Sequence, residues 1–124
     1  MTEINSKLVI GTANFGLEYG VTNNNGKLSD ADIGDIINEA KLANIKTFDT
    51  AQGYGDSEEK LGAFVKKEMS IVTKIGNEFN IKKGDNNLRN FFTQSLHRLK
   101  CEKVYGLLLH NPDVLLGRNG SEIV

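Results

Sequence analysis

The pattern of apolar and polar positions changes its period several times along the chain. Short runs of apolar and β-branched residues, each bounded by turn-forming or polar residues, are typical of buried parallel strands. The last of these runs is almost continuously apolar, so we expect it to be buried on both faces. Strands are predicted at residues 7–11, 46–49, 70–74 and 104–110.

Segments with helical spacing separate the predicted strands. The first helix begins after Ser29, a good N-cap, and Asp32 three residues later completes a capping box. Its buried face is expected to consist of Ile33, Ile36, Ile37 and Ala40. Asn44 then lies where helices often end on a left-handed residue. Residues 12–28, which precede this helix, are rich in glycine and asparagine and are predicted to form a long loop.

Two more helices are predicted further along the chain. One is capped by Asp56 or Ser57, and its apolar positions are Leu61, Phe64 and Val65. The other starts at Asp85 or Asn86 and has the clearest apolar face. That face consists of Leu88, Phe91, Phe92, Ser95, Leu96 and Leu99.

The predicted elements alternate strictly between strand and helix. This order favours parallel strands joined by right-handed crossovers, in either an open doubly wound sheet or a barrel. A closed barrel of eight strands needs about 250 residues, and this chain has 124. Pro112 opens another helical run, and a further helix is predicted to begin at Ser121–Glu122, close to the final Val124. We therefore expect a C-terminally truncated domain over residues 1–124, with open sheet edges that could pair with a second copy.

Composition and charge exclude several classes of partner. The net charge of -1 gives no long-range attraction to nucleic acid or to an anionic membrane. The N-terminal residues contain no apolar run typical of a signal peptide, and no segment has about 20 apolar residues, so a cytoplasmic protein is expected. A single cysteine and two histidines predict neither an internal disulfide nor a metal site.

Four ionisable residues fall at or just beyond the carboxyl ends of the predicted strands, where α/β proteins bind ligands. Asp49 closes the second strand, Tyr54 lies in the loop after it, Lys74 closes the third strand, and His110 closes the fourth. Each residue alone has an ordinary structural explanation, such as a helix cap, half-buried packing or a solvated strand end. Together they predict a functional site at one edge of the sheet.

These side chains suit proton transfer to a carbonyl oxygen. A phenol has a pKa of about 10, so it donates a proton at neutral pH only when a positive charge stabilises the phenolate. Lys74 would provide that charge, Asp49 would hold the ammonium in place, and His110 would orient the substrate oxygen. Tyr54 would then act as the general acid in the reduction of a carbonyl by hydride.

Short motifs in five separate segments carry a family resemblance. They are Gly11-Thr12; Phe48-Asp49-Thr50-Ala51 followed by Tyr54-Gly55, Ser57-Glu58 and Leu61-Gly62; Thr73-Lys74; Ser95-Leu96 with Arg98-Leu99; and Leu108-Leu109-His110. In this order they resemble the aldo-keto reductases. The resemblance implies the N-terminal half of a (β/α)8 TIM barrel, about four βα units with parallel strands. It also implies reduction of a small aldehyde or ketone with NADP or NAD as the cofactor.

The resemblance also assigns residues. It implies an Asp-Tyr-Lys-His tetrad at Asp49, Tyr54, Lys74 and His110, and it places Gly11, Thr12 and Asp49 near the nicotinamide ribose. Most cofactor contacts in the family come from later strands that this sequence does not include, so we expect the isolated chain to be inactive. The alternative is a non-catalytic nucleotide-binding or regulatory protein on the same fold, although the presence of all four tetrad residues favours an enzyme.

Overall fold

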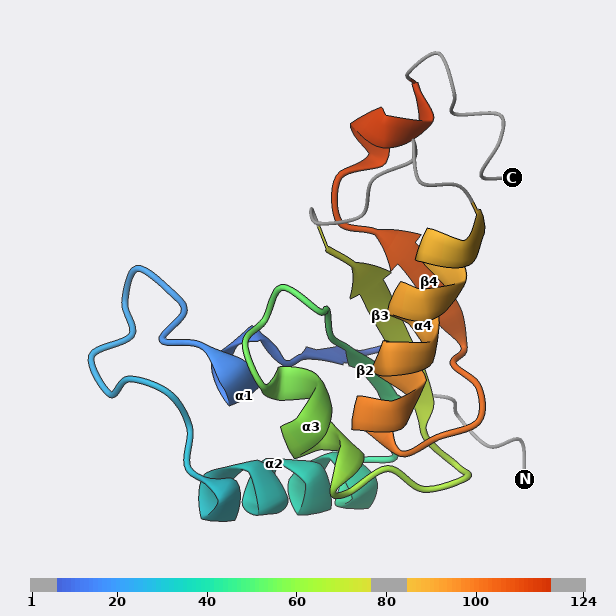
Figure 1. Ribbon diagram of the computed structural model, residues 1–124. Coiled ribbons are helices and arrows are strands. Elements are labelled where there is room, and N and C mark those ends of the chain that lie inside the picture. The colour runs from blue at the N-terminus through green and yellow to red at the C-terminus, as the bar shows by residue number, and fades with distance from the viewer. Residues whose placement is uncertain (1–6, 77–84, 117–124) are drawn as a thin grey trace.

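The computed structural model describes residues 7–76 and 85–116, in which strands and helices alternate (Figure 1). The strands form one parallel sheet in the order β1-β2-β3-β4. They are β1 (Val9–Gly11), β2 (Thr47–Asp49), β3 (Ser70–Ile75) and β4 (Gly106–Leu109). All the predicted strands are present. Three are shorter than expected, whereas β3 extends one residue further.

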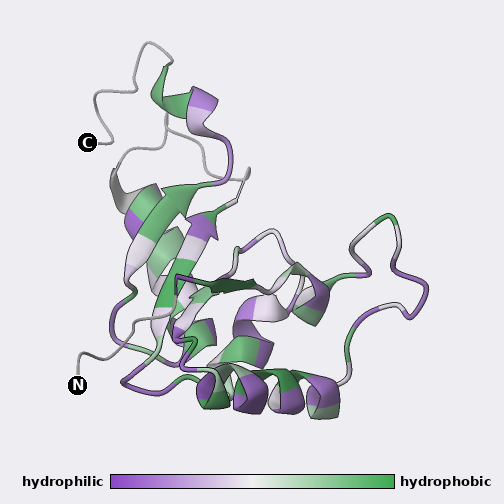
Figure 2. Cartoon of the chain, turned by 180° about the vertical axis from the view of Figure 1, so that it is seen from behind, coloured by the Kyte–Doolittle hydropathy of each residue, from purple (hydrophilic) through white to green (hydrophobic). Residues whose placement is uncertain are grey.

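The strand order distinguishes between the two architectures that the sequence left open. A doubly wound sheet reverses its strand order at a switch point, whereas the described strands follow one another in a single direction. With right-handed crossovers, this order places the connecting helices on the same side of the sheet. The two opposite views agree with this placement for α4, which lies in front of β3 and β4 in Figure 1 and behind them in Figure 2. The described part of the chain therefore has the winding of a barrel.

Helix α2 (Asp30–Leu42) begins with the predicted capping box. The Ser29 hydroxyl accepts a hydrogen bond from the Asp32 backbone N–H at 3.2 Å, and the Ser29 N–H donates to Asp32 Oδ2 at 3.1 Å. The helix buries Ile33 and Ala40. Asn44, two residues beyond the helix, has a φ of 54°, which confirms the predicted left-handed position.

We expect Ser29→Ala to destabilise the protein by about 1 kcal/mol, the usual cost of losing an N-cap, as measured by urea unfolding. The Ser29 hydrogen bonds lower the pKa of the Asp32 carboxyl. A lowered folded-state pKa stabilises the fold above the unfolded value of 3.8, and this stabilisation is lost as pH falls below it. The difference in the free energy of unfolding between wild type and Ser29→Ala should therefore become smaller below pH 3.8.

The segment predicted as a continuous loop contains a short helix, α1 (Ala13–Gly16). Its Phe15 is only 2% exposed, in contact with the core. Local sequence preference did not indicate this helix, because four residues make too few internal hydrogen bonds to be stable alone. Packing of Phe15 against residues distant in sequence provides the stability that the segment lacks.

Helix α3 (Ser57–Gly62) is shorter than predicted. Its N-cap is Asp56, whose side chain makes no capping hydrogen bond and instead pairs with Lys27 at 2.5 Å. This ion pair lowers the pKa of the Asp56 carboxyl. The helix ends at Gly62, a poor helix former, so Phe64 and Val65 lie beyond it but still pack against the core.

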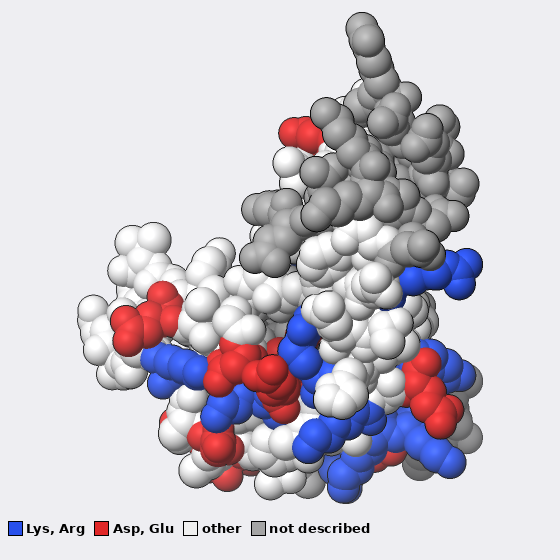
Figure 3. Space-filling model, in the orientation of Figure 1, with Lys and Arg blue, Asp and Glu red and all other residues white. Residues whose placement is uncertain are grey.

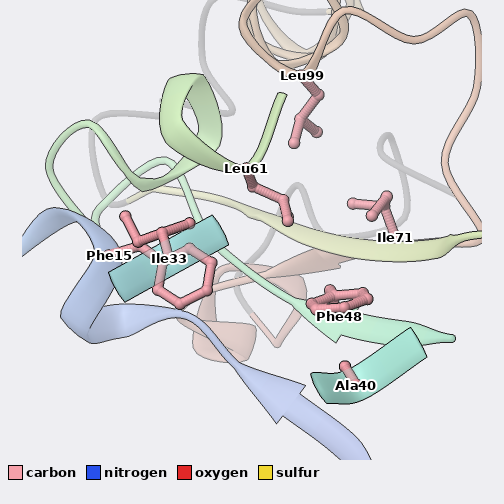
Figure 4. Close-up of a cluster of buried hydrophobic side chains, with 7 residues drawn as sticks. All are labelled: Phe15, Ile33, Ala40, Phe48, Leu61, Ile71 and Leu99. Atoms are coloured by element: carbon pink, nitrogen blue, oxygen red, sulfur yellow. The ribbon is translucent and has the colours of Figure 1, made fainter. Parts of the chain in front are cut away.

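Helix α4 (Asp85–Leu99) starts where predicted and completes the core. It buries Ser95 and Leu99 completely. Figure 4 shows the buried side chains converging from α1, α2, α3, α4, β2 and β3. They are Phe15, Ile33, Ala40, Phe48, Leu61, Ile71 and Leu99. This core lies between the sheet and the helices, and it does not include the residues at the carboxyl ends of the strands.

The prediction that the last strand is buried on both faces is wrong. Leu107 is 38% exposed and Leu108 is 48% exposed. Strand β4 lies at the edge of the described sheet and pairs only with β3. Most of β4 has the green colour of hydrophobic residues in Figure 2, and no other described strand pairs with its free edge.

The remaining expectations concern the surface and the C-terminal residues. Acidic and basic side chains are interspersed over the face shown in Figure 3, mostly around α2 and α3. Within residues 7–76 and 85–116, no helix has the length and apolar character needed to cross a membrane. The helical run predicted from Pro112 is a 3₁₀ helix, Pro112–Leu115. The helix predicted from Ser121–Glu122 lies outside the described residues.

Candidate functional site

The four residues predicted to carry chemistry lie at the same edge of the sheet. Asp49 is the last residue of β2, Lys74 is the penultimate residue of β3, and His110 directly follows β4. The His110 N–H donates to the Ile75 carbonyl at 2.9 Å, which extends the pairing of β3 with β4 to this position. Tyr54 lies in the loop between β2 and α3. The parallel register therefore brings together groups that are up to 61 residues apart in sequence.

Lys74 is held by two acceptors. Its Nζ lies 2.6 Å from Asp49 Oδ2 and donates a second hydrogen bond to the Thr50 carbonyl at 3.2 Å. The Lys74 side chain is 17% exposed and that of Asp49 is 32% exposed, so solvent screens this ion pair less than a surface pair. The ammonium therefore has a fixed position and direction.

Tyr54 lies close to both the ammonium and the imidazole. Lys74 Nζ is 5.3 Å from the centroid of the Tyr54 ring, within the range of a cation–π interaction. The Tyr54 and His110 rings meet edge to face, with centroids 5.8 Å apart and planes at 82°. The Lys74 ammonium therefore lies over the aromatic ring of Tyr54.

Gly11 and Thr12 have different surroundings. A Cβ added at Gly11 would meet no atom within 4 Å, so the end of β1 leaves open space beside this backbone. The Thr12 side chain is fully buried, and both its N–H and its hydroxyl point to the Asp49 carbonyl, at 2.9 and 3.0 Å. Thr12 therefore supports the backbone of Asp49 from within the protein, and of this pair only Gly11 faces open space.

A buried group of three hydroxyls lies beneath the site, and the sequence reasoning did not identify it. Ser57 Oγ is 2.8 Å from Thr12 Oγ1 and 3.0 Å from Thr50 Oγ1, and it donates to the Thr12 carbonyl at 2.8 Å. All three side chains are fully buried. Because these residues come from the ends of β1, β2 and the start of α3, their hydrogen bonds fix the loop that carries Tyr54. The sequence signal for Thr12 and Thr50 was their position directly after a strand, whereas Ser57 was indicated only as a possible helix cap.

Glu58 forms a second buried polar group behind the site. Its carboxylate is 1% exposed, accepts a hydrogen bond from the Thr73 hydroxyl at 2.6 Å and pairs with Arg98 Nε at 2.7 Å. The three residues belong to α3, β3 and α4. A buried carboxylate is stable only when it is paired and hydrogen-bonded, and here both of its oxygens have partners.

Two glycines allow the turn at Tyr54 to pack against α1. A Cβ on Gly16 would lie 1.7 Å from the Tyr54 carbonyl oxygen, which is impossible without moving the backbone. Gly55 has a φ of 59°, and a Cβ there would lie 2.4 Å from the Gly16 carbonyl oxygen. Glycine is therefore required at both positions by sterics. Gly16 lies in the segment 12–28 that was predicted as a loop, and its close approach to Tyr54 is visible only in the structure.

The site contains a phenol, an ammonium, a carboxylate and an imidazole in one cluster. Such a set can donate a proton and stabilise negative charge on an oxygen. Among the residues that the structure describes, no group of three or more His, Cys, Asp or Glu side chains could hold a metal ion.

Comparison with known proteins gives the same family from sequence and from structure. The model of the aldo/keto reductase family matches residues 7–117. Two solved structures of an aldo-keto reductase from Pseudomonas aeruginosa have TM-scores of 0.73, with 31% and 30% identity. They cover 86% and 90% of this chain. A comparison with curated proteins finds no match.

A third solved structure is a thermostable aldo-keto reductase in complex with the inhibitor epalrestat. It covers 85% of this chain with a TM-score of 0.61, and at 24% identity it supports the fold alone. The chain spans 43% of the length of each Pseudomonas aeruginosa structure and 39% of the third. Its four parallel strands and the helices between them therefore correspond to less than half of these aldo-keto reductase chains. By family model, fold and identity, this chain belongs to the aldo/keto reductase family.

Proposed function

We propose that this chain supplies the proton-donating side of a carbonyl reductase that uses NADPH or NADH. In the reaction, the carbon of an aldehyde or ketone receives a hydride, and its oxygen receives a proton from the Tyr54 hydroxyl. The observation that carries the proposal is the Lys74 ammonium, held by Asp49 and the Thr50 carbonyl, 5.3 Å from the centroid of the Tyr54 ring. A fixed positive charge at this distance stabilises the phenolate that remains after proton transfer.

Each neighbour of Tyr54 has a separate role in the proposal. Asp49 holds the ammonium and neutralises its charge while the phenol is protonated. His110, edge-on to the Tyr54 ring, is exposed and hydrogen-bonds the substrate oxygen so that it lies near the phenol. Lys74 restores a proton to Tyr54 from solvent after each reaction cycle, directly or through water.

The described residues fit one edge of a nicotinamide cofactor. The open space at Gly11 admits a flat ring close to the backbone, and the carboxylate of Asp49 can accept a hydrogen bond from a ribose hydroxyl. When bound, NAD(P)H supplies the hydride. Since the chain spans 43% of the Pseudomonas aeruginosa structures, the reaction is proposed for the complete barrel to which these residues contribute.

The reaction class is tested with a composite barrel, in which residues 7–117 replace the matching segment of the Pseudomonas aeruginosa relative. We expect this barrel to reduce members of a panel of aldehydes and ketones. With NADPH deuterated at the transferred position of the nicotinamide, mass spectrometry should find one deuterium on the carbinol carbon of each product. Binding of NADPH without any labelled product would instead support the non-catalytic alternative.

A further inference from the structure

Gln52 is a partly buried residue between Asp49 and Tyr54, and all the polar groups of its side chain have partners. Its Nε2 donates to the Phe91 carbonyl at 2.7 Å and to the Ser95 hydroxyl at 2.8 Å. Its Oε1 accepts from the Gly76 N–H at 3.3 Å. The Gln52 backbone N–H donates to the Lys74 carbonyl at 3.0 Å. Four hydrogen bonds therefore anchor one residue of a surface loop.

These bonds use the properties of a primary amide. An amide provides two N–H donors and a carbonyl acceptor in one plane, and this site uses both donors and the acceptor. A glutamate of the same shape would keep the acceptor but would have no donor when ionised, and its charge would face the Phe91 carbonyl oxygen. The site is thus complementary to glutamine rather than to polar residues in general.

The anchors connect Tyr54 to the strand that carries Lys74. The Tyr54 N–H donates to the Ala51 carbonyl at 3.1 Å, so Gln52 and Gly53 form the middle of a tight turn that ends at Tyr54. Gln52 ties this turn to the backbone on both sides of Ile75 and to the middle of α4. The same turn lies near His110, since a Cβ added at Gly53 would be 3.8 Å from the His110 ring.

We propose that Gln52 is a positioning residue that sets the placement of the Tyr54 ring relative to Lys74 and His110. The inference rests on the proposed function for its effect on catalysis, but the geometry itself can be tested without turnover. A shift of about 1 Å in a proton donor lowers the rate of a positioned reaction by up to about 100-fold. Loss of the amide donors should therefore lower kcat, with little effect on cofactor binding.

The kinetic test compares Gln52→Glu with Gln94→Glu, the same change on the exposed surface of α4, in the composite barrel. We expect Gln52→Glu to lower kcat about 10-fold to 100-fold with an unchanged KM for NADPH, and Gln94→Glu to have no effect. Because a protonated carboxyl regains one donor, the deficit relative to wild type should shrink from pH 8 to pH 5. The proposal would be overturned if the loss of kcat in Gln52→Glu were the same at every pH, or if the substitution changed only KM.

The second test measures the geometry in the full chain by NMR of labelled histidine. The edge-to-face Tyr54 ring shifts the proton resonances of the His110 ring, and Gln52→Glu should move them toward the values of a free histidine. If Gln52→Glu does not fold, Ser95→Ala, which removes one anchor within a helix, should produce a smaller shift in the same direction. Unchanged His110 resonances would refute the positioning role. Failure of the composite barrel without any substitution to reduce carbonyls would refute only the proposed function.

Discussion

Tyr54→Phe is expected to lower kcat for carbonyl reduction in the composite barrel by about 10²-fold to 10⁴-fold, the usual contribution of a general acid. Phenylalanine keeps the aromatic ring that contacts Lys74 and His110, so the packing of the site is preserved. Only the hydroxyl that carries the transferred proton is lost. The measurement is the steady-state oxidation of NADPH with a saturating aldehyde, and affinity for NADPH should stay within about twofold.

Tyr105→Phe is the matched control for this experiment. Tyr105 is 79% exposed, so removal of its hydroxyl should leave kcat unchanged. If Tyr54→Phe retains more than a tenth of wild-type kcat while Tyr105→Phe behaves as wild type, the proton comes from another group. His110 would then be the next candidate, since its ring lies against that of Tyr54.

Arg98→Leu is expected to destabilise the fold by about 3 kcal/mol, because it leaves a buried carboxylate without its counter-charge. Glu58 is 1% exposed, and the Thr73 hydroxyl alone cannot replace the charge of the guanidinium. Substitution of the other partner, Glu58→Gln, should lower the free energy of unfolding less. It leaves Arg98 without its partner, but the Arg98 side chain is 27% exposed and can turn toward water. Urea unfolding of both variants would reveal this asymmetry.

The ion pair between Lys60 and Asp30 provides the control for Arg98→Leu. The Asp30 side chain is 74% exposed, so removal of this pair by Asp30→Asn should lower the free energy of unfolding much less than Arg98→Leu does. Equal costs for Arg98→Leu and Asp30→Asn would show that the burial of Glu58 does not determine the energetics. Equal costs for Arg98→Leu and Glu58→Gln would contradict the argument from unequal exposure.

Much of the fold could be predicted from local sequence signals. The capping box at Ser29 and the left-handed Asn44 depend on residues within a few positions of one another, and both are found as predicted. The strands were recognisable as short runs of apolar and β-branched residues between turn-forming or polar residues, a pattern typical of parallel strands buried by helices. The burial of β4 was predicted wrongly for the same reason, since an apolar run cannot indicate which neighbours will cover it.

The candidate site was only partly predictable. Asp49, Tyr54, Lys74 and His110 could be grouped from the sequence, because parallel strands bring their carboxyl ends to one edge. The groups that hold them could not be identified in this way. Gln52, Ser57 and Glu58 are polar residues in ordinary polar segments, and their partners lie in other elements.

The sequence by itself determined the alternation of strands and helices, the parallel direction of the strands and the edge at which the ionisable residues gather. These properties follow from hydrophobic period, capping and chain direction, which are all local. Only the tertiary structure decided that helix α1 forms, that Gly16 must lack a side chain, and that the Lys74 ammonium faces the ring of Tyr54. Those outcomes depend on atoms that meet across long stretches of sequence, where a shift of about 1 Å changes which contact is made.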